Sequence, residues 1–321
     1  MVMPRLVAGM FSVALMVVAA GGVSAQNYPD RPIRVITAAA GGGNDYVMRQ
    51  VTPLVSDSIG QPVIVDNRGG AGNLPVELAA RSPADGYTLL GHSNSVWVGP
   101  LLRKLAYDPV KDFSPVALVA RAPYVLVVHP SVAANSIKEL IAFAKANPGK
   151  LNYSMTSVGG GAHLSSELFK AMAGGLNIVR ISYKTSSQEA SDLIAGHVQM
   201  AFSDAGTVSP HIKSGRMKAL GVASAQPSPL VPGLPTIASS LPGFESYQLI
   251  GLFAPATTPA AIIRRLNQEF VRVVNMPEVK ERLFNGGVEA VGSSPEQFGA
   301  TVKSDIAKMS KVIKDADIRV E

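Results

Sequence analysis

The chain has 321 residues, enough for two domains of ordinary size, each with its own core. Hydrophobic residues make up 47% of the chain and charged residues 16%, which is a globular composition and excludes a disordered chain. The formal net charge is +6, but the Lys and Arg residues are spread along the chain without interleaved aromatic residues, which argues against a nucleic-acid-binding protein. Such a mildly basic surface is either simply a soluble surface or an aid to the arrival of anions.

The first 25 residues have the pattern of a secretory signal peptide. Arg5 is followed by an apolar run over residues 6–20 and by the small residues Val23, Ser24 and Ala25, so we expect cleavage after Ala25. The run is shorter than the ~20 apolar residues that a membrane anchor needs. The chain contains no cysteine, so it has no disulfide and no N-terminal cysteine to carry a lipid. These features predict a soluble periplasmic protein, although secretion out of the cell fits them as well.

Short apolar strands alternate with amphipathic helices along the chain. The first expected strands lie at residues 33–37, 62–65 and 87–91. A helix over residues 44–59 should end at Gly60, and Pro53 inside it should kink or shorten it. This alternation predicts an α/β fold with parallel sheets and helices on both faces.

Two apolar runs are candidates for strands that cross between two lobes. They are residues 124–128 (YVLVV) and residues 249–254 (LIGLFA), with a complete series of strands and helices between them. The Pro-rich segment 227–242 favours a linker that returns the chain to the first lobe. The expected domains are a signal peptide at residues 1–25, a first lobe of residues 27–124 plus 250–321, and a second lobe of residues 125–249. A single long α/β domain is the alternative.

Two glycine-rich turns follow predicted strands and open predicted helices. They cover residues 38–45 (AAAGGGND) and residues 156–163 (TSVGGGAH). A helix N-terminus offers unpaired N–H groups and the positive end of the helix dipole, and glycine lets an anion approach this backbone closely. Ligands of open α/β sheets lie beyond the carboxyl ends of the strands, so the two turns would hold an anion from both sides of one cleft. The alternative is that the glycines only make tight turns.

Two further polar turns follow predicted strands. The first, residues 92–95, offers hydroxyls and an amide that could bind a carboxylate. In the second, residues 203–207, Asp204 would repel a carboxylate but could accept a hydrogen bond from a ligand hydroxyl or amine, or it could cap the next helix. His163, at the start of a helix, either contacts ligand or is a packed or capping residue.

The sequence carries no signature of an enzyme. The segment Gly91–Ser95 differs from a nucleophile elbow because its last position is Ser rather than Gly. Neither glycine turn matches the dinucleotide fingerprint or the P-loop. The five histidines are scattered and show no paired spacing for a metal. We therefore expect that the protein is not an enzyme and that it has no cofactor and no metal site.

Six motifs together resemble the substrate-binding receptors of tripartite tricarboxylate transporters, the Bug-type receptors. They occur in the order of the family and span nearly the whole mature chain: residues 28–34 (YPDRPIR), 41–45 (GGGND), 67–72 (NRGGAG), 85–90 (DGYTLL), 107–113 (YDPVKDF) and 147–153 (NPGKLNY). The resemblance implies a periplasmic-binding-protein-like Venus flytrap, with a mostly parallel sheet in each of two lobes and two crossover strands.

The resemblance also implies a function: capture of a small organic carboxylate (a di- or tricarboxylate or an aromatic carboxylate) and its delivery to inner-membrane permease subunits. The receptor would be a monomer. The ligand-binding residues that carry over are Gly42, Gly43, Asn44 and Asp45 in the first loop, His92, Ser93, Asn94 and Ser95 after the next strand, Ser157, Gly159, Gly160, Gly161 and His163 in the second lobe, and Tyr183, Lys184, Thr185, Ser203 and Asp204 around the cleft. A periplasmic sensor that feeds a two-component kinase is the alternative function.

The chain departs from the family pattern on its ligand loops. Ala40 stands where the family has a proline, and Thr37 and Ala38 replace a Pro-Phe segment. The second-lobe loop has Val158, Gly160 and Gly161 where hydroxyl or amide side chains are usual, and Ser203-Asp204 replaces an Asp-Asn pair. These smaller side chains predict a roomier or differently shaped pocket.

Overall fold

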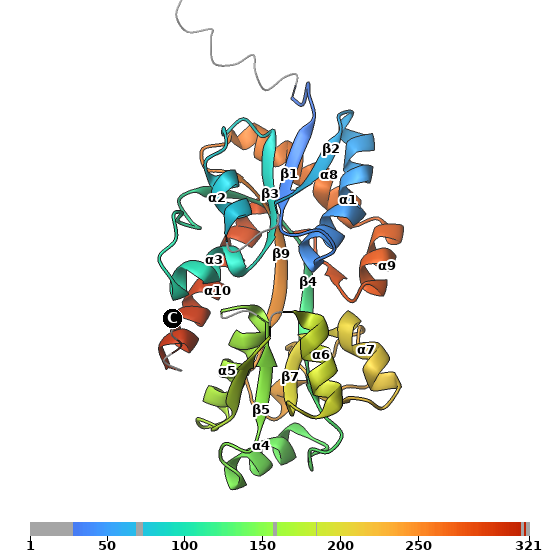
Figure 1. Cartoon of the computed structure of the whole chain (residues 1–321). Coiled ribbons are helices and arrows are strands. Elements are labelled where there is room, and N and C mark those ends of the chain that lie inside the picture. Colours follow the sequence, from blue (N-terminus) through green and yellow to red (C-terminus); the bar gives the residue numbers. More distant parts are fainter. Residues whose placement is uncertain (1–27, 69–72, 157–158, 184, 316–317, 319–321) are drawn as a thin grey trace, which may run out of the picture.

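The protein has two lobes that are joined at a narrow waist (Figure 1). The structure is a computed structural model that describes residues 28–68, 73–156, 159–183, 185–315 and 318. Strands β4 (Phe113–Val128) and β9 (Tyr247–Pro255) run through the waist. This arrangement confirms the predicted α/β fold with two lobes and two crossover strands. The expected signal peptide lies outside the described residues, and within them no helix is long and apolar enough to cross a membrane.

The first lobe is built on a parallel set of three strands. β1 (Ile33–Thr37) pairs with β2 (Val63–Asn67) on one side and with β3 (Thr88–Ser93) on the other. Three helices follow these strands in turn: α1 (Gly43–Ile59), α2 (Leu74–Ala80) and α3 (Ser95–Leu102). The C-terminal part of the chain adds α8 (Ala260–Val274), α9 (Pro277–Asn285), β10 (Glu289–Ala290) and α10 (Pro295–Asp315).

The second lobe repeats this plan. β5 (Asn152–Met155) pairs in parallel with β6 (Val179–Ser182) and β7 (Met200–Asp204). Its other elements are α4 (Ile137–Ala146), α5 (Gly161–Met172), α6 (Ser186–Ala195), α7 (Ala205–Lys213), β8 (Lys218–Val222) and the short 3₁₀ helix η1 (Ile237–Ser239). In both lobes, a loop at the carboxyl end of a parallel strand therefore leads directly into a helix N-terminus.

Strand β4 belongs to both lobes because its partners change along its length. Residues 113–123 pair antiparallel with β9, whereas residues 124–128 pair antiparallel with β7 and β8. The change falls between Pro123 and Tyr124, and on this basis we propose the division into lobes that the sequence predicts. The predicted crossover run 124–128 is thus only the second-lobe end of a longer strand.

Each lobe has its own apolar core, so each can move as a unit. In the first lobe, Phe270 and Phe298 are fully buried on opposite faces of the sheet. In the second lobe, Phe169, Phe202 and Phe244 pack against one another. Burying one such side chain contributes about 1.5–3 kcal/mol, so these clusters hold each lobe together independently of the waist.

Helix α10 links the two cores beside the crossover strands. Its first half buries Phe298 in the first lobe, and its last turns bury Val312 in the second-lobe cluster. Between them, Asp305 accepts a hydrogen bond from Nε1 of Trp97 at 2.7 Å, and Nζ of Lys308 donates to the carbonyl of Glu245. Any change in the angle between the lobes must therefore accommodate α10.

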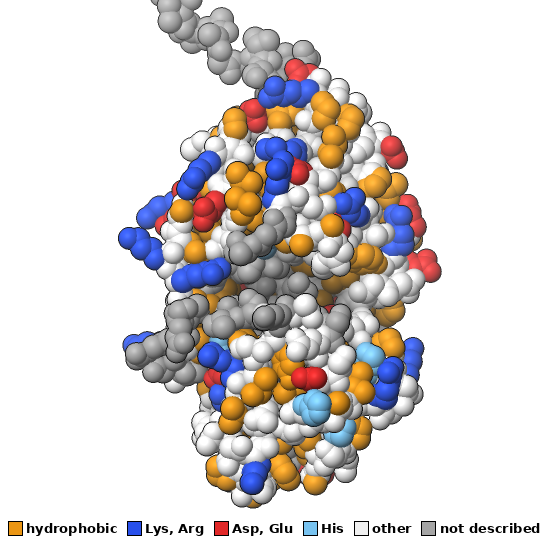
Figure 2. Space-filling model, viewed as in Figure 1, with side chains coloured by type: hydrophobic (Ala, Val, Ile, Leu, Met, Phe, Trp, Pro, Cys, Tyr) orange, Lys and Arg blue, Asp and Glu red, His pale blue; other side chains and the backbone are white. Residues whose placement is uncertain are grey.

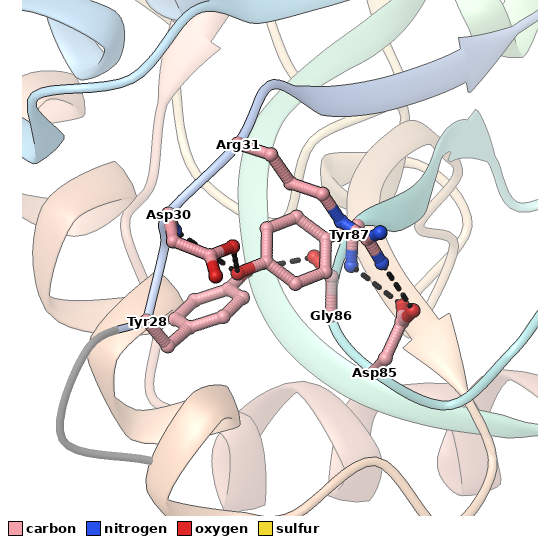
Figure 3. A network of polar contacts seen from close by, with 6 residues as sticks. All are labelled: Tyr28, Asp30, Arg31, Asp85, Gly86 and Tyr87. Carbon is pink, nitrogen blue, oxygen red and sulfur yellow. Dashed lines mark hydrogen bonds and ion pairs between the residues drawn. The ribbon is translucent and has the colours of Figure 1, made fainter. Parts of the chain in front are cut away.

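The start of the described chain is fastened to the turn before β3 (Figure 3). Two of the six family-like motifs, residues 28–34 and 85–90, meet here. The side-chain bonds join the Tyr28 hydroxyl to the carbonyl of Gly86 (2.7 Å), the Tyr87 hydroxyl to Oδ1 of Asp30 (2.6 Å), and Arg31 to Asp85 (3.0 Å). The two motifs are therefore structural partners at the far end of the first lobe, and no ligand role is needed to explain them.

The structure changes two local predictions: Pro53 does not shorten its helix, and one strand ends later than expected. Helix α1 continues through Pro53 as one helix of 17 residues, because Pro53 lies on the exposed face, where water can bind the carbonyl that loses its N–H partner. Strand β3 ends later than predicted, so His92 and Ser93 belong to the strand and pair with Gly251 and Ile250 of β9. The extra antiparallel partner β9 extends the strand beyond the point where the apolar run ends.

Candidate functional site

The two glycine loops have the same backbone construction, one in each lobe. Gly41 and Gly159 adopt left-handed conformations with φ of 79° and 77°. The next residue is extended in both loops and forms the helix N-cap, with φ and ψ of −83° and 169° at Gly42 and −68° and 162° at Gly160. Neither helix has a side-chain hydrogen bond at its cap, whereas α6 and α7 are capped by the side chains of their own N-cap residues. The first N–H groups of α1 and α5 therefore have no partner within their helices.

In each loop, a side chain four residues after the left-handed glycine accepts a hydrogen bond from the N–H of that glycine. Oδ2 of Asp45 accepts from Gly41, and Nδ1 of His163 accepts from Gly159, both at 2.9 Å. Asp45 is 4% exposed and His163 is 1% exposed. Both predicted ligand contacts are therefore already engaged within their own loops, where they hold the backbone in place.

The carboxylate of Asp45 is compensated by its neighbours. Oδ1 accepts hydrogen bonds from Nε of Arg49 and from Nδ2 of Asn67, both at 2.8 Å. Burial by itself would raise the pKa of Asp45, but the bonds from Gly41, Asn67 and Arg49 outweigh burial and lower the pKa. Asp45 therefore stays ionised at neutral pH, and Asn67, from the motif at residues 67–72, ties β2 to this loop.

His163 is neutral. Burial lowers its pKa to about 4, and the opposing influence of Glu167 does not restore the pKa to its usual value. Because Nδ1 accepts a hydrogen bond from Gly159, the single ring proton lies on Nε2. The second-lobe loop thus offers its N–H groups without a charged side chain of its own.

A cavity of about 220 Å³ lies where the second-lobe loop meets the waist. Gly160 and Gly161 line it together with Tyr124 of β4 and Gln248 of β9. A Cβ atom built on Gly43 would lie 3.5 Å from Nε2 of Gln248, so the same glutamine also contacts the first-lobe loop. Gln248 therefore connects the two loops across the space between the lobes.

The lobes also touch directly on either side of this cavity. A Cβ on Gly159 would overlap Cδ1 of Leu102 at the end of α3, and a Cβ on Gly206 at the start of α7 would lie 3.1 Å from the carbonyl of Gly286. Figure 2 shows Lys and Arg side chains spread over the outer surface of the first lobe. The described residues that line the cavity of about 220 Å³ include Gly160 and Gly161 but no Lys or Arg, so the donors among them are main-chain N–H groups, hydroxyls and the side-chain amide of Gln248.

The predicted turn at residues 92–95 does not line this cavity. Burial lowers the pKa of His92 to about 4, and its Nδ1 lies 3.2 Å from the Ser95 hydroxyl, which in turn lies 3.1 Å from the Ser93 hydroxyl. Nδ2 of Asn94 donates to the carbonyl of Tyr247 at 3.2 Å, and Asn94 lines a separate cavity of about 450 Å³ beside α10. The side chains of this turn mainly stabilise the β3–α3 connection.

The other predicted residues divide between the cavity and structural roles. Ser203 and Asp204 line the cavity, and Asp204 also caps α7 by accepting from the Thr207 N–H at 2.8 Å. Tyr183 is packed in the second-lobe core, where burial first and then its bond to Asp192 raise its pKa to about 12. Thr185 accepts from the Gln188 N–H as the N-cap of α6. Ser157 and Lys184 lie outside the described residues.

Among the cavity residues that the sequence analysis did not predict, three are polar and lie outside every turn that it singled out: Tyr124, Gln248 and Glu189. Tyr124 is the first residue of one apolar crossover run and Gln248 directly precedes the other, and the contrast of these polar groups with the apolar residues that follow was an available signal. Glu189 gave no such signal, because an acidic residue in the first turn of a helix is ordinary. Within the described residues, no group of three His, Asp or Glu side chains is placed to hold a metal.

Comparison with known proteins assigns the family. The model described as "Tripartite tricarboxylate transporter family receptor" matches residues 47–318. The chain belongs to this family. Protein BugT of Bordetella pertussis is 35% identical to this receptor over 308 residues, which cover 94% of each chain.

Solved structures agree with this assignment. The structure of R. palustris Rpa4515 with adipate has a TM-score of 0.80 and 33% identity, and the match covers 91% of this receptor and 99% of that chain. MatC from Rhodopseudomonas palustris with bound malate has a TM-score of 0.76 and 27% identity, over 89% of this receptor and 100% of that chain. The resemblance predicted from the six motifs is thereby confirmed.

Proposed function

We propose that this receptor captures a small organic carboxylate in the periplasm and delivers it to the permease subunits of a tripartite tricarboxylate transporter. Membership of the receptor family supports the transport role. Similar proteins bound to adipate and to malate support a carboxylate ligand. The expected export after Ala25 would place the protein where such ligands arrive.

The observation that carries the proposal is the pair of glycine loops at the edges of the two lobes. In each loop, the N–H of the left-handed glycine is already bonded, to Asp45 or to His163, which leaves the following N–H groups at the helix N-terminus for a ligand. These groups carry the positive end of the helix dipole, and the cap residues Gly42 and Gly160 have no side chain of their own that could cover them.

Closure of the lobes would complete the site. A ligand held by both loops stabilises the closed form because the open form offers only one loop at a time. The largest core clusters of the two lobes are separate, so such a motion would be accommodated mainly where β4, β9 and α10 join the lobes. The closed form is the state that the permease would recognise.

A thermal-shift screen across mono-, di- and tricarboxylates tests the proposal. A ligand that binds only the folded protein raises the melting temperature, with a stabilisation of about 2.7 kcal/mol at a hundredfold excess over Kd. We expect at least one carboxylate to do so, and sugars and neutral amides of similar size to have no effect. If no carboxylate shifted the melting temperature, the proposed function would be wrong.

A further inference from the structure

The second-lobe side of the cavity is acidic. Glu189 of α6 and Asp204 at the N-terminus of α7 both line it, beside the hydroxyl-bearing residues Tyr124, Thr156 and Ser203. Among the described residues that line this cavity there is no Lys or Arg. Among the described lining residues, an anionic group that entered this side would therefore meet two carboxylates and no cationic side chain.

The carboxylate of Glu189 is held in place by a hydrogen bond from strand β5. Its Oε1 accepts a hydrogen bond at 2.9 Å from the hydroxyl of Ser154, which is completely buried in β5. Burial raises the pKa of Glu189, the bond from Ser154 opposes this effect, and the negative charge of Asp204 raises the pKa further. A positive charge next to Glu189 would relieve both of the unfavourable effects at once.

Asp204 has a fixed orientation as well. Its Oδ1 accepts from the Thr207 N–H at 2.8 Å and its Oδ2 accepts from the Thr207 hydroxyl at 2.9 Å. These two bonds keep the carboxylate at the cavity wall. They leave acceptor capacity on both oxygens, because each carboxylate oxygen has two lone pairs.

The Tyr124 hydroxyl at this wall is a hydrogen-bond donor. Burial first, and then the nearby charge of Asp204, raise the pKa of Tyr124, so its hydroxyl stays protonated. The cavity thus combines donors, the Tyr124 hydroxyl and the N–H groups at Gly160 and Gly161, with acceptors, Glu189 and Asp204. Such a site matches a ligand that carries both a hydrogen-bond acceptor, such as a carboxylate, and a hydrogen-bond donor, such as an amine.

We infer that this receptor selects an aminocarboxylate, whose carboxylate binds at the glycine-capped helix N-termini and whose protonated amine binds at Glu189 beside Asp204. The inference rests on the proposed function and narrows its ligand class. A plain dicarboxylate would place its second carboxylate against Glu189 and Asp204, and like charges held this close are strongly unfavourable.

The test compares ligands of equal chain length that differ only in one end group. Calorimetric titration of the purified protein would use 6-aminohexanoate against adipate, and 4-aminobutyrate against succinate. We expect the aminocarboxylate of the fitting length to bind at least about tenfold more tightly than its dicarboxylate partner. In Glu189→Gln, which keeps an acceptor for Ser154, we expect this preference to fall to near unity as the dicarboxylate gains affinity.

Asp192→Asn is the matched control. Asp192 lies on the same helix α6 and bonds to the Tyr183 hydroxyl, but it does not line the cavity. Loss of this carboxylate lowers the net negative charge of the helix by the same amount as Glu189→Gln. We expect the ligand preference of Asp192→Asn to equal that of the wild type, so that a change seen only in Glu189→Gln reports local contact rather than overall charge.

The outcomes separate the inference from the proposed function. If dicarboxylates bound more tightly than aminocarboxylates in the wild type, or if Glu189→Gln left the preference unchanged, the inference would be overturned while carboxylate capture would stand. If neither series bound and the wider carboxylate screen also gave no response, the proposed function itself would fail. A preference for the aminocarboxylate that is lost only in Glu189→Gln would support both.

Discussion

The glycine loops of the two lobes show how one backbone arrangement can be held by two different side chains. Both loops place a left-handed glycine, an extended glycine and a helix start in the same order, and both tie the first N–H to a side chain one turn along. In the first lobe that side chain is the ionised Asp45, and in the second it is the neutral His163. The geometry of the two helix N-termini is therefore shared, but their electrostatics are not.

This difference affects what each loop can bind. The charge of Asp45 is balanced by the ion pair with Arg49, and a hydrogen bond from Asn67 stabilises the same carboxylate. In the second loop the side chain that holds the glycine, His163, is neutral, so it does not oppose the helix dipole. The negative charges of the second lobe lie outside its glycine loop, on Glu189 and Asp204, which line the same cavity as Gly160 and Gly161. The two lobes thus offer equivalent donors in unlike surroundings.

The largest expected effect comes from placing a carboxylate at either cap. Gly42→Asp and Gly160→Asp fit the extended backbone at these positions, and the new side chain would accept from the free N–H groups and repel an anionic ligand. We expect each variant to weaken carboxylate binding by at least about a hundredfold, with stability unchanged or raised by a few tenths of a kcal/mol. Titration calorimetry and urea unfolding measure the two quantities, and Gly42→Ala is the uncharged control. Unchanged affinity in either Asp variant would remove that loop from the site.

The next effect depends on how much room each loop has for an added side chain, rather than on charge. A Cβ on Gly161 would overlap the Tyr124 hydroxyl, whereas a Cβ on Gly43 would make only an ordinary contact with Gln248. We expect Gly161→Ala to lower the free energy of unfolding by about 1–3 kcal/mol because Tyr124 must move, and Gly43→Ala to change it by less than about 0.5 kcal/mol. Urea unfolding followed by circular dichroism checks the pair. Equal losses would mean that Tyr124 does not support the second loop.

A third effect is the pH range over which each loop contributes to the stability of the protein. The folded pKa of His163, about 4, lies below its usual value of 6.5, so the unfolded chain binds this proton first and stability falls as the pH drops from about 6.5 toward 4. His92 titrates in the same window and in the same direction. The folded pKa of Asp45 is also lowered, so its contribution is lost only as the pH falls below the usual range of an aspartate.

Unfolding curves of the wild type and of His163→Gln between pH 7.5 and pH 4.5 test this assignment. We expect the wild type to lose on the order of 1–3 kcal/mol more stability over this interval than the variant, whose side chain does not titrate. His92 remains in both proteins and cancels in the comparison. Parallel curves for the two proteins would show that His163 is not buried in its neutral form.

The smallest effect is expected far from both loops. Arg31 and Asp85 form an exposed ion pair with side chains 60% and 39% exposed, and Arg31 also lies 4.2 Å above the ring of Tyr87. Such pairs contribute little, so Arg31→Ala should lower the free energy of unfolding by about 0–1 kcal/mol and leave the ligand Kd unchanged. A weakened Kd in this variant would show that the N-terminal network influences the cleft, contrary to the view that it only fastens the chain.

Much of the fold was predictable because its signals are local. The strand at residues 33–37 and the helix that ends at Gly60 both agree with the structure. The glycine loops were also recognisable, since a run of three glycines between a strand and a helix is a strong local pattern. Pro53 misled the analysis, because exposure on the helix surface, which makes a proline tolerable, depends on the rest of the lobe.

The side-chain roles were harder to predict, because they depend on which atoms the fold brings together. The spacing of four residues from Gly41 to Asp45 and from Gly159 to His163 was visible, but only the left-handed glycine conformation turns that spacing into a hydrogen bond. Gln248 lies far along the chain from both loops, and Glu189 looks like an ordinary surface residue of α6. Their positions at the cavity follow from the crossover of β9 and from the packing of α6, which a single sequence does not reveal.

The central claim is that main-chain N–H groups of both lobes bind the ligand, and amide resonances report on them directly. Titration of ¹⁵N-labelled protein with a carboxylate selected by the thermal-shift screen should move the amide signals of Gly43 and Gly161 strongly. Those of Gly41 and Gly159, whose N–H groups are already bonded to Asp45 and His163, should move much less. A saturating ligand that left the Gly43 and Gly161 signals in place would contradict the account.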